Sequence, residues 1–177
     1  VGDTLGQVYM CREDLKVEVS GKLSPLHVFY DWGASVTMIT HRAARAAGLM
    51  PIRQPARQVM GLGGTGVEST CYYFAPIADA AGKLQVVKAI GVSHIARMPR
   101  TRSLDDLPGM FRGMTGKKIS AETSACEVDM LVGLDNSRWM PTPGPAPIFP
   151  DINLRLVKSA FSGAYIAMGQ TKEGGGE

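Results

Sequence analysis

The sequence predicts a mainly β chain folded as one domain, and three observations lead to this fold class. Many short segments rich in β-branched and aromatic residues are separated by glycine, serine or proline turns. Only one stretch, residues 41–49, has the alanine-rich composition of a clear helix. The length of 177 residues, with 45% hydrophobic and 20% charged residues, suits one domain with its own core. We therefore expect a single domain over residues 1–177 with one or two short helices.

The first third of the chain predicts two strands, a tight turn, a short strand and a helix. Residues 7–31 contain stretches of alternating polar and apolar residues and break at Ser20-Gly21. The segment "VTMIT" (36–40) predicts a short strand. The helix follows at once, with Thr40 as its predicted N-cap and Gly48 as its end.

A glycine cluster separates two extended segments and predicts a hairpin over about residues 57–77. Gly61, Gly63 and Gly66 match the G-x-G-x-x-G pattern of dinucleotide sites. In those sites a helix follows the glycines, whereas "VESTCYYFAPI" follows here and predicts a strand. No Gly-Lys-Ser/Thr ending is present, which excludes a P-loop. We interpret the glycines as a movable hairpin tip.

The second half predicts further strands around an irregular insertion. Residues 83–95 predict a strand or a strand pair. Residues 97–126 are rich in Pro, Gly, Arg and Met, and predict an insertion with a short helix around Leu104 to Phe111. Residues 126–140 predict a buried strand and a short helix, followed by a proline-rich extended connector. Residues 152–169 predict two closing strands around a Ser-Gly turn.

Charge and residue spacing exclude several functional classes. The net charge of +3 is too small to indicate nucleic-acid binding, and the basic stretch at 94–102 is typical of a solvated loop. Three distant cysteines without a Cys-x-x-Cys pattern argue against a zinc site or a disulfide framework, and favour a reducing compartment. No metal-ligand spacing and no membrane-spanning apolar run is present, so we expect no metal, no cofactor and no membrane. Because the chain lacks an initiator Met and a signal peptide, we expect a piece of a longer protein.

Asp31 is the candidate catalytic residue. It ends the apolar strand "LHVFY" and precedes the small residues Gly33, Ala34 and Ser35, whose backbone amides can approach a carboxylate closely. The alternative is a turn residue that caps its own backbone, which is the commoner role of Asp before x-Gly. The apolar strand before it and the glycine hairpin about thirty residues later favour a functional acid.

The order of these segments resembles the retropepsin-like aspartic peptidases. "DWGASVTMITHRAARAAGL" is similar to their Asp-Thr/Ser-Gly turn, strand and helix, "MGLGGTG" to their flap, and "VDMLVGLDNSRW" to the strand, Gly-x-Asp and helix that close the lobe. "LRLVKSAFSGAYIAMG" resembles a segment that follows the protease in BEL/Pao-type retrotransposon polyproteins, to which the chain is most similar. The resemblance implies a closed β-barrel lobe with a glycine-rich flap.

The resemblance also implies a mechanism and site residues. Two carboxylates must share one proton, and the chain has a single Asp-x-Gly turn, so a homodimer would supply the second Asp31. Gly133 would have a structural role in close packing, and Asp135 would cap the short helix. The residues implied in substrate binding are Gly33, Ala34, Gly61, Leu62, Gly63 and Gly64.

Trp32 departs from the pattern, because the family usually has Thr or Ser there. In the family this hydroxyl links the two Asp loops across the dimer axis, whereas indole offers one donor and no acceptor. Ser35 could take over part of this link. We therefore keep two hypotheses. One is an aspartic endopeptidase of retroelement origin that processes polyproteins inside the cell, in the cytoplasm or in a retroelement particle. The other is a catalytically impaired or domesticated domain for dimerisation or peptide binding.

Overall fold

The computed structural model describes residues 8–60, 64, 66–98, 119–120, 125–143 and 153–170. The prediction of a mainly β chain is confirmed, since the described chain consists largely of strands and its helical segments are short. The predicted helix around Leu104 to Phe111 and most of the insertion over 97–126 lie outside the described residues. Among the residues that are described, no helix has the length and apolar character needed to cross a bilayer.

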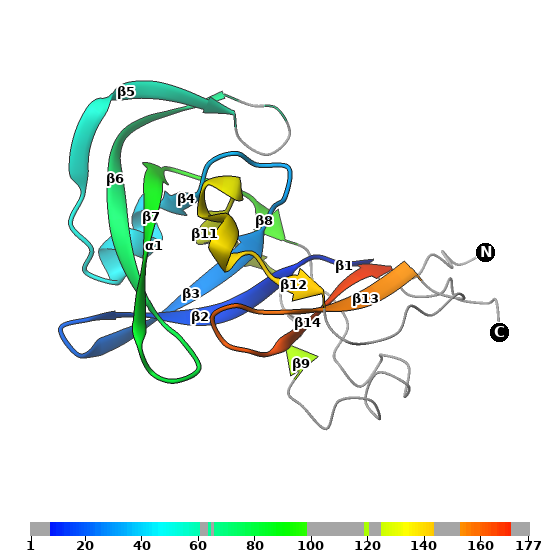
Figure 1. Cartoon of the computed structure of the whole chain (residues 1–177). Helices are drawn as coiled ribbons and strands as arrows, with labels where there is room; N and C mark the ends of the chain where they lie inside the picture. The colour runs from blue at the N-terminus through cyan, green and yellow to red at the C-terminus, as the bar shows by residue number, and fades with distance from the viewer. Residues whose placement is uncertain are drawn as a thin grey trace.

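The largest sheet has seven strands in the order β2-β3-β11-β4-β7-β6-β5 (Figure 1). An additional antiparallel pairing of β2 with β6 joins Val17 to Ile77, so that two strands distant in the order also meet. The strands of this sheet are β2 (Arg12–Val19), β3 (Lys22–Tyr30), β4 (Met38–Thr40), β5 (Ile52–Met60), β6 (Gly66–Ala78), β7 (Leu84–Val92) and β11 (Met130–Val132).

Strands β2 and β3 form the predicted hairpin. The turn between them places Ser20 at φ 52° and Gly21 at φ 79°, and two successive positive φ values are what a two-residue hairpin turn requires. Alternate residues of β2 are buried, including Leu15 and Val17, as the alternation of apolar and polar residues predicts.

Strand β11 lies between β3 and β4, although β3 and β4 are consecutive in the chain. It runs parallel to β3, with Leu131 opposite Phe29, and antiparallel to β4, with Leu131 opposite Met38. The loop from residue 31 to 37 must therefore cross the end of β11. This insertion of β11 positions the loop that begins with Asp31.

Helix α1 (His41–Ala46) follows β4 directly. The Thr40 hydroxyl accepts a hydrogen bond from the Ala43 N–H at 3.2 Å, which confirms the predicted N-cap. Gly48 has φ +80° just after the helix, as a glycine that ends a helix does. Ala43 and Ala44 face the core.

A smaller sheet contains β1 (Val8–Tyr9), β14 (Tyr165–Gln170), β13 (Asn153–Lys158) and β12 (Thr142–Pro143) in that order, and β9 (Ile119–Ser120) pairs with β14. Figure 1 shows it on the right, away from the β5–β6 hairpin at the top. A separate two-stranded pair joins β8 (Arg97–Met98) to β10 (Cys126–Glu127). The short helix after β11 is a 3-10 helix, η3 (Leu134–Trp139).

A buried polar contact links the two larger sheets. The Glu13 carboxylate on β2 is 2% exposed. It accepts hydrogen bonds from the Tyr30 hydroxyl at 2.6 Å and from the Ser162 hydroxyl, in the β13–β14 turn, at 2.7 Å. Trp139 stacks on Phe161 with ring centroids 4.6 Å apart and strengthens the same junction. The turn after β13 is thus fixed to the large sheet by a charge-assisted and an aromatic contact.

Two side chains near this junction, Cys11 and Tyr30, should make the free energy of unfolding depend on pH in the alkaline range. Burial, and then the charge of Glu13, raises the pKa of the Cys11 thiol from 9.0 to about 12, and the same two causes raise the pKa of Tyr30 well above 10.0. The unfolded thiol therefore loses its proton before the folded one. We expect the free energy of unfolding to decrease between about pH 9 and pH 12, with each group contributing at most about 1.4 kcal/mol per pH unit.

Urea unfolding of the wild type and of Cys11→Ala at a series of pH values checks this expectation. The variant should be less stable at neutral pH, since it loses buried volume, but its stability should decrease less steeply above pH 9. Equal slopes for the two proteins would contradict the proposed role of Cys11.

Candidate active site

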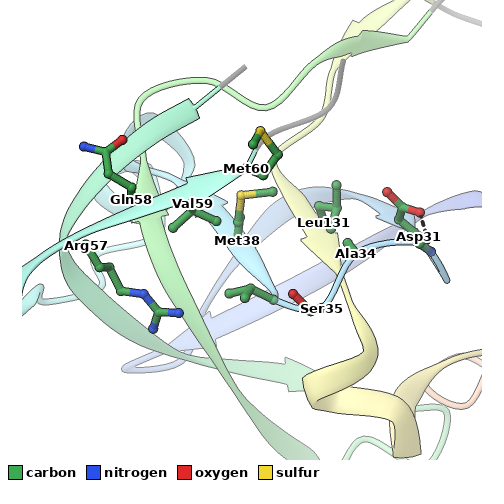
Figure 2. A pocket seen from close by; sticks show the side chains of 11 residues that line it. Asp31, Ala34, Ser35, Met38, Arg57, Gln58, Val59, Met60 and Leu131 are labelled. Carbon is green, nitrogen blue, oxygen red and sulfur yellow. Dashed lines mark hydrogen bonds between the residues drawn. The ribbon is translucent and has the colours of Figure 1, made fainter. Parts of the chain in front are cut away.

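A cleft of about 430 Å³ lies between the loop that begins with Asp31 and strand β5. Figure 2 shows β5 on one side and the Asp31 loop on the other, with Met38 and Leu131 between them. Met38, Leu131 and Val59 also belong to a cluster of buried apolar residues. The base of the cleft is therefore part of the core. The lining residues are Asp31, Gly33, Ala34, Ser35, Val36, Met38, Arg57, Gln58, Val59, Met60 and Leu131.

Asp31 is half-buried at one end of this cleft. Its own N–H continues the β3–β11 ladder by donating to the Val132 carbonyl at 3.0 Å. Its carboxylate Oδ1 accepts a hydrogen bond from the Gly33 N–H at 2.8 Å, drawn as a dashed line in Figure 2. This is also the contact of an ordinary Asx turn, so the position of Asp31 in the cleft, and not this hydrogen bond, makes it a candidate for catalysis.

The small residues after Asp31 allow the loop to bend tightly around the carboxylate. A Cβ atom on Gly33 would lie 3.2 Å from Asp31 Oδ1, closer than side chains ordinarily approach. The Ala34 N–H donates to the Asp31 carbonyl at 3.2 Å. Gly33, Ala34 and Ser35 line the cleft together with Asp31.

Thr37 fixes the far end of the loop through a fully used hydroxyl. The side chain is 0% exposed, and its Oγ1 donates to Asp135 Oδ1 at 2.6 Å. The same oxygen accepts from the Gly133 N–H at 3.0 Å and from Asn136 Nδ2 at 2.8 Å. The Thr37 N–H donates to Asp135 Oδ2 at 3.1 Å. One hydroxyl therefore joins the loop to the start of η3 through three hydrogen bonds.

Gly133 lies against the same loop. A Cβ atom there would come within 2.8 Å of the carbonyl oxygens of both Ala34 and Val36, which are backbone atoms that cannot move aside cheaply. The next residue, Leu134, donates its N–H to the Ala34 carbonyl at 2.8 Å. The close approach of β11 to the loop thus requires glycine at this position.

The prediction that Asp135 caps the short helix is wrong. The N-cap of η3 is Gly133, and no side chain caps the helix. The Asp135 carboxylate instead accepts both hydrogen bonds from Thr37, because the loop places the N–H and the hydroxyl of that residue directly opposite it.

Other predicted site residues lie elsewhere. Trp32 is 41% exposed and does not line the cleft. Gly64 is exposed with φ +80° and does not line it either. Gly61, Leu62 and Gly63 lie outside the described residues. Within the described ranges, no group of three or more His, Cys, Asp or Glu side chains could hold a metal ion.

Two parts of this site were not predicted from the sequence: Thr37 and the residues of β5. A hydroxyl between Val36 and Met38 was a usable signal for Thr37, because a buried hydroxyl in an apolar strand needs partners. Arg57 could have been found from the alternation of "PARQVM", in which Arg57 and Val59 share a face of the strand.

No protein-family model matches the chain, and no curated protein sequence matches it. Among solved structures, the chain is similar to the retroviral protease-like domain of Ddi1 from Leishmania major. The two are 16% identical, the match covers 86% of this chain and 90% of that one, and the TM-score is 0.44.

We expect Thr37→Val to destabilise the fold by about 2–4 kcal/mol, because it leaves the Gly133 N–H and the Asp135 carboxylate without their common partner. The matched control is Thr37→Ser, which keeps the hydroxyl and loses only a methyl group, at a cost of about 1 kcal/mol. Urea unfolding measures both. Equal stabilities for the two variants would mean that the hydroxyl network contributes little.

Proposed function

We propose that this chain is a retropepsin-like aspartic endopeptidase that acts as a homodimer, with one Asp31 from each copy at its centre. The observation that supports this most directly is the position of Asp31. Its carboxylate lies at the end of a cleft with an apolar base, on a loop held at both ends by hydrogen bonds. A carboxylate in such a position is fixed in space yet open to a substrate.

The reaction requires a second acid. One carboxylate takes a proton from water while the other, protonated, donates its proton to the carbonyl oxygen of the peptide bond. The oxygen of the water then bonds to the carbonyl carbon, and the carbon–nitrogen bond breaks as the nitrogen is protonated. The chain contains one Asp-x-Gly turn, so a two-fold axis next to Asp31 would provide the partner.

Exposed apolar side chains next to the loop support a dimer at this face. Trp32, adjacent to Asp31, is 41% exposed, and Leu134 is 48% exposed. Leu134 lies against the same loop through its hydrogen bond to Ala34. Large apolar side chains that gather at the surface are typical of an interface.

The substrate would be an extended peptide. Strand β5 lies at the end of the sheet order, and of the described strands only β6 pairs with it. An unpaired strand edge beside a cleft is suited to receive an extended chain through main-chain hydrogen bonds. The glycine-rich tip at residues 61–64 would then close over the peptide as a flap. Origin in a BEL/Pao-type retroelement, polyprotein processing and a location inside the cell remain predictions from the resemblance.

One observation favours the second hypothesis, a non-catalytic domain for dimerisation or peptide binding. Trp32 stands where the resemblance implies a hydroxyl, and the indole cannot both donate and accept. Ser35 lines the cleft, and within the described part of the chain its hydroxyl has no hydrogen bond to another residue. The link between two Asp31 loops would then be weaker than in the family.

We expect Asp31→Asn to reduce kcat/KM for peptide hydrolysis by at least about a thousandfold, because the amide cannot exchange the required proton. The fold of the Asn variant should stay intact, and urea unfolding checks this. Wild-type activity should be highest at acidic to near-neutral pH, should be inhibited by a statine-type transition-state mimic and should be insensitive to chelators. Cleavage that persists in the Asn variant would refute the assignment.

We expect Trp32→Thr to raise kcat/KM, since it supplies the hydroxyl that the pattern lacks. Trp32→Ala is the control, because it removes the indole without adding a donor and an acceptor. Sedimentation velocity on both variants reports the dimer. If Trp32→Thr is no more active than Trp32→Ala, or dissociates, the indole itself stabilises the pairing of the two copies and the hydroxyl link is not needed.

A further inference from the structure

The part of β5 that lines the cleft, residues 57–60, carries one cation, Arg57. In the β5–β6 ladder, Arg57 is opposite Ser69 and Val59 is opposite Val67. Directly opposed residues of antiparallel strands lie on the same face. Since Ser69 and Val59 are 1% and 7% exposed, this face points inward. Arg57 thus occupies an inward-facing position and lines the cleft.

Of the described residues that line this cleft, two are charged, Arg57 and Asp31, and Figure 2 draws them at opposite ends of it. Among the described residues, the Arg57 guanidinium forms no ion pair and no hydrogen bond with another side chain. Other arginines do have partners: Arg42 pairs with Asp129 at 3.0 Å, and Arg138 lies 4.7 Å from the Trp139 ring centroid. The cleft therefore presents a positive charge to whatever enters it.

We infer that Arg57 determines specificity by binding an acidic side chain, Asp or Glu, of an extended peptide in the cleft. This inference rests on the proposed function. The planar guanidinium can donate two parallel hydrogen bonds to one carboxylate. Because Arg57 and Asp31 lie at opposite ends, the recognised side chain belongs to a residue away from the bond that is cleaved.

The register of β5 directs Arg57 to this position. Arg53 is opposite Cys71 and Arg57 is opposite Ser69, so four steps along β5 match two along β6. The extra residues include Pro55, which lacks an N–H and is tolerated at a bulge of an edge strand. Arg53 lies before this irregularity and does not line the cleft.

The test uses pairs of peptides that differ only by Glu or Gln at one position, and scans that position along the peptide. The wild type should cleave one Glu peptide about tenfold faster, by kcat/KM, than its Gln counterpart, a modest factor because Arg57 is exposed. Arg57→Gln should abolish this preference, and Arg57→Glu should shift it to a Lys peptide. Arg53→Gln is the matched control on the same strand and should keep the preference. Added salt should reduce the wild-type preference.

Binding of the same peptides to the Asp31→Asn protein, measured by fluorescence anisotropy, separates the two proposals. If the wild type cleaves nothing, but the Asn variant binds the Glu peptide in an Arg57-dependent manner, the specificity is upheld and the peptidase assignment fails. If cleavage occurs with no acidic preference at any position, or with one that Arg57→Gln leaves unchanged, the inference is overturned and the peptidase assignment stands. Neither cleavage nor binding would overturn both.

Discussion

The arrangement of the site depends on the insertion of β11 between β3 and β4. These two strands are neighbours in the chain but not in the sheet, so the loop between them must pass over the end of β11. The crossing is close enough to exclude a Cβ atom on Gly133, and Thr37 fastens it with a hydroxyl that uses all three of its hydrogen-bonding possibilities. The position of Asp31 is a consequence of this crossing.

A second contact, the one at Glu13 between the two larger sheets, also holds the loop of Asp31 in place. Tyr30, the last residue of β3, donates to Glu13, and Glu13 also accepts from Ser162 in the turn of the smaller sheet. The residue that directly precedes Asp31 is therefore attached to both sheets. Burying a carboxylate is costly unless it is hydrogen-bonded, and here the two hydroxyl donors compensate that cost. The strand that presents the candidate acid is held at its very end.

Much of the fold could be predicted from local patterns, because each element is specified by residues close in sequence. The hairpin turn at Ser20-Gly21, the cap at Thr40 and the glycine at 48 are local features with a direct physical reading. The order β3-β11-β4 could not be derived in this way, since it pairs residues about a hundred positions apart. For the same reason the partner of Asp135 was mistaken: a helix cap is a local solution, whereas Thr37 is a distant one that only the crossing brings near.

The site was predicted in part for a similar reason. Asp31 and the small residues after it form one contiguous segment, and they line the cleft together. The opposite wall comes from β5, which lies in a different part of the sequence and pairs with β6. The two walls thus come from separate segments of the sequence, and they are held in place differently. Buried hydrogen bonds hold the Asp31 loop, whereas pairing with β6 holds β5. Under the proposed function, substitutions in β5 would change which peptides the cleft binds without moving Asp31, so related chains would differ in specificity and share one reaction.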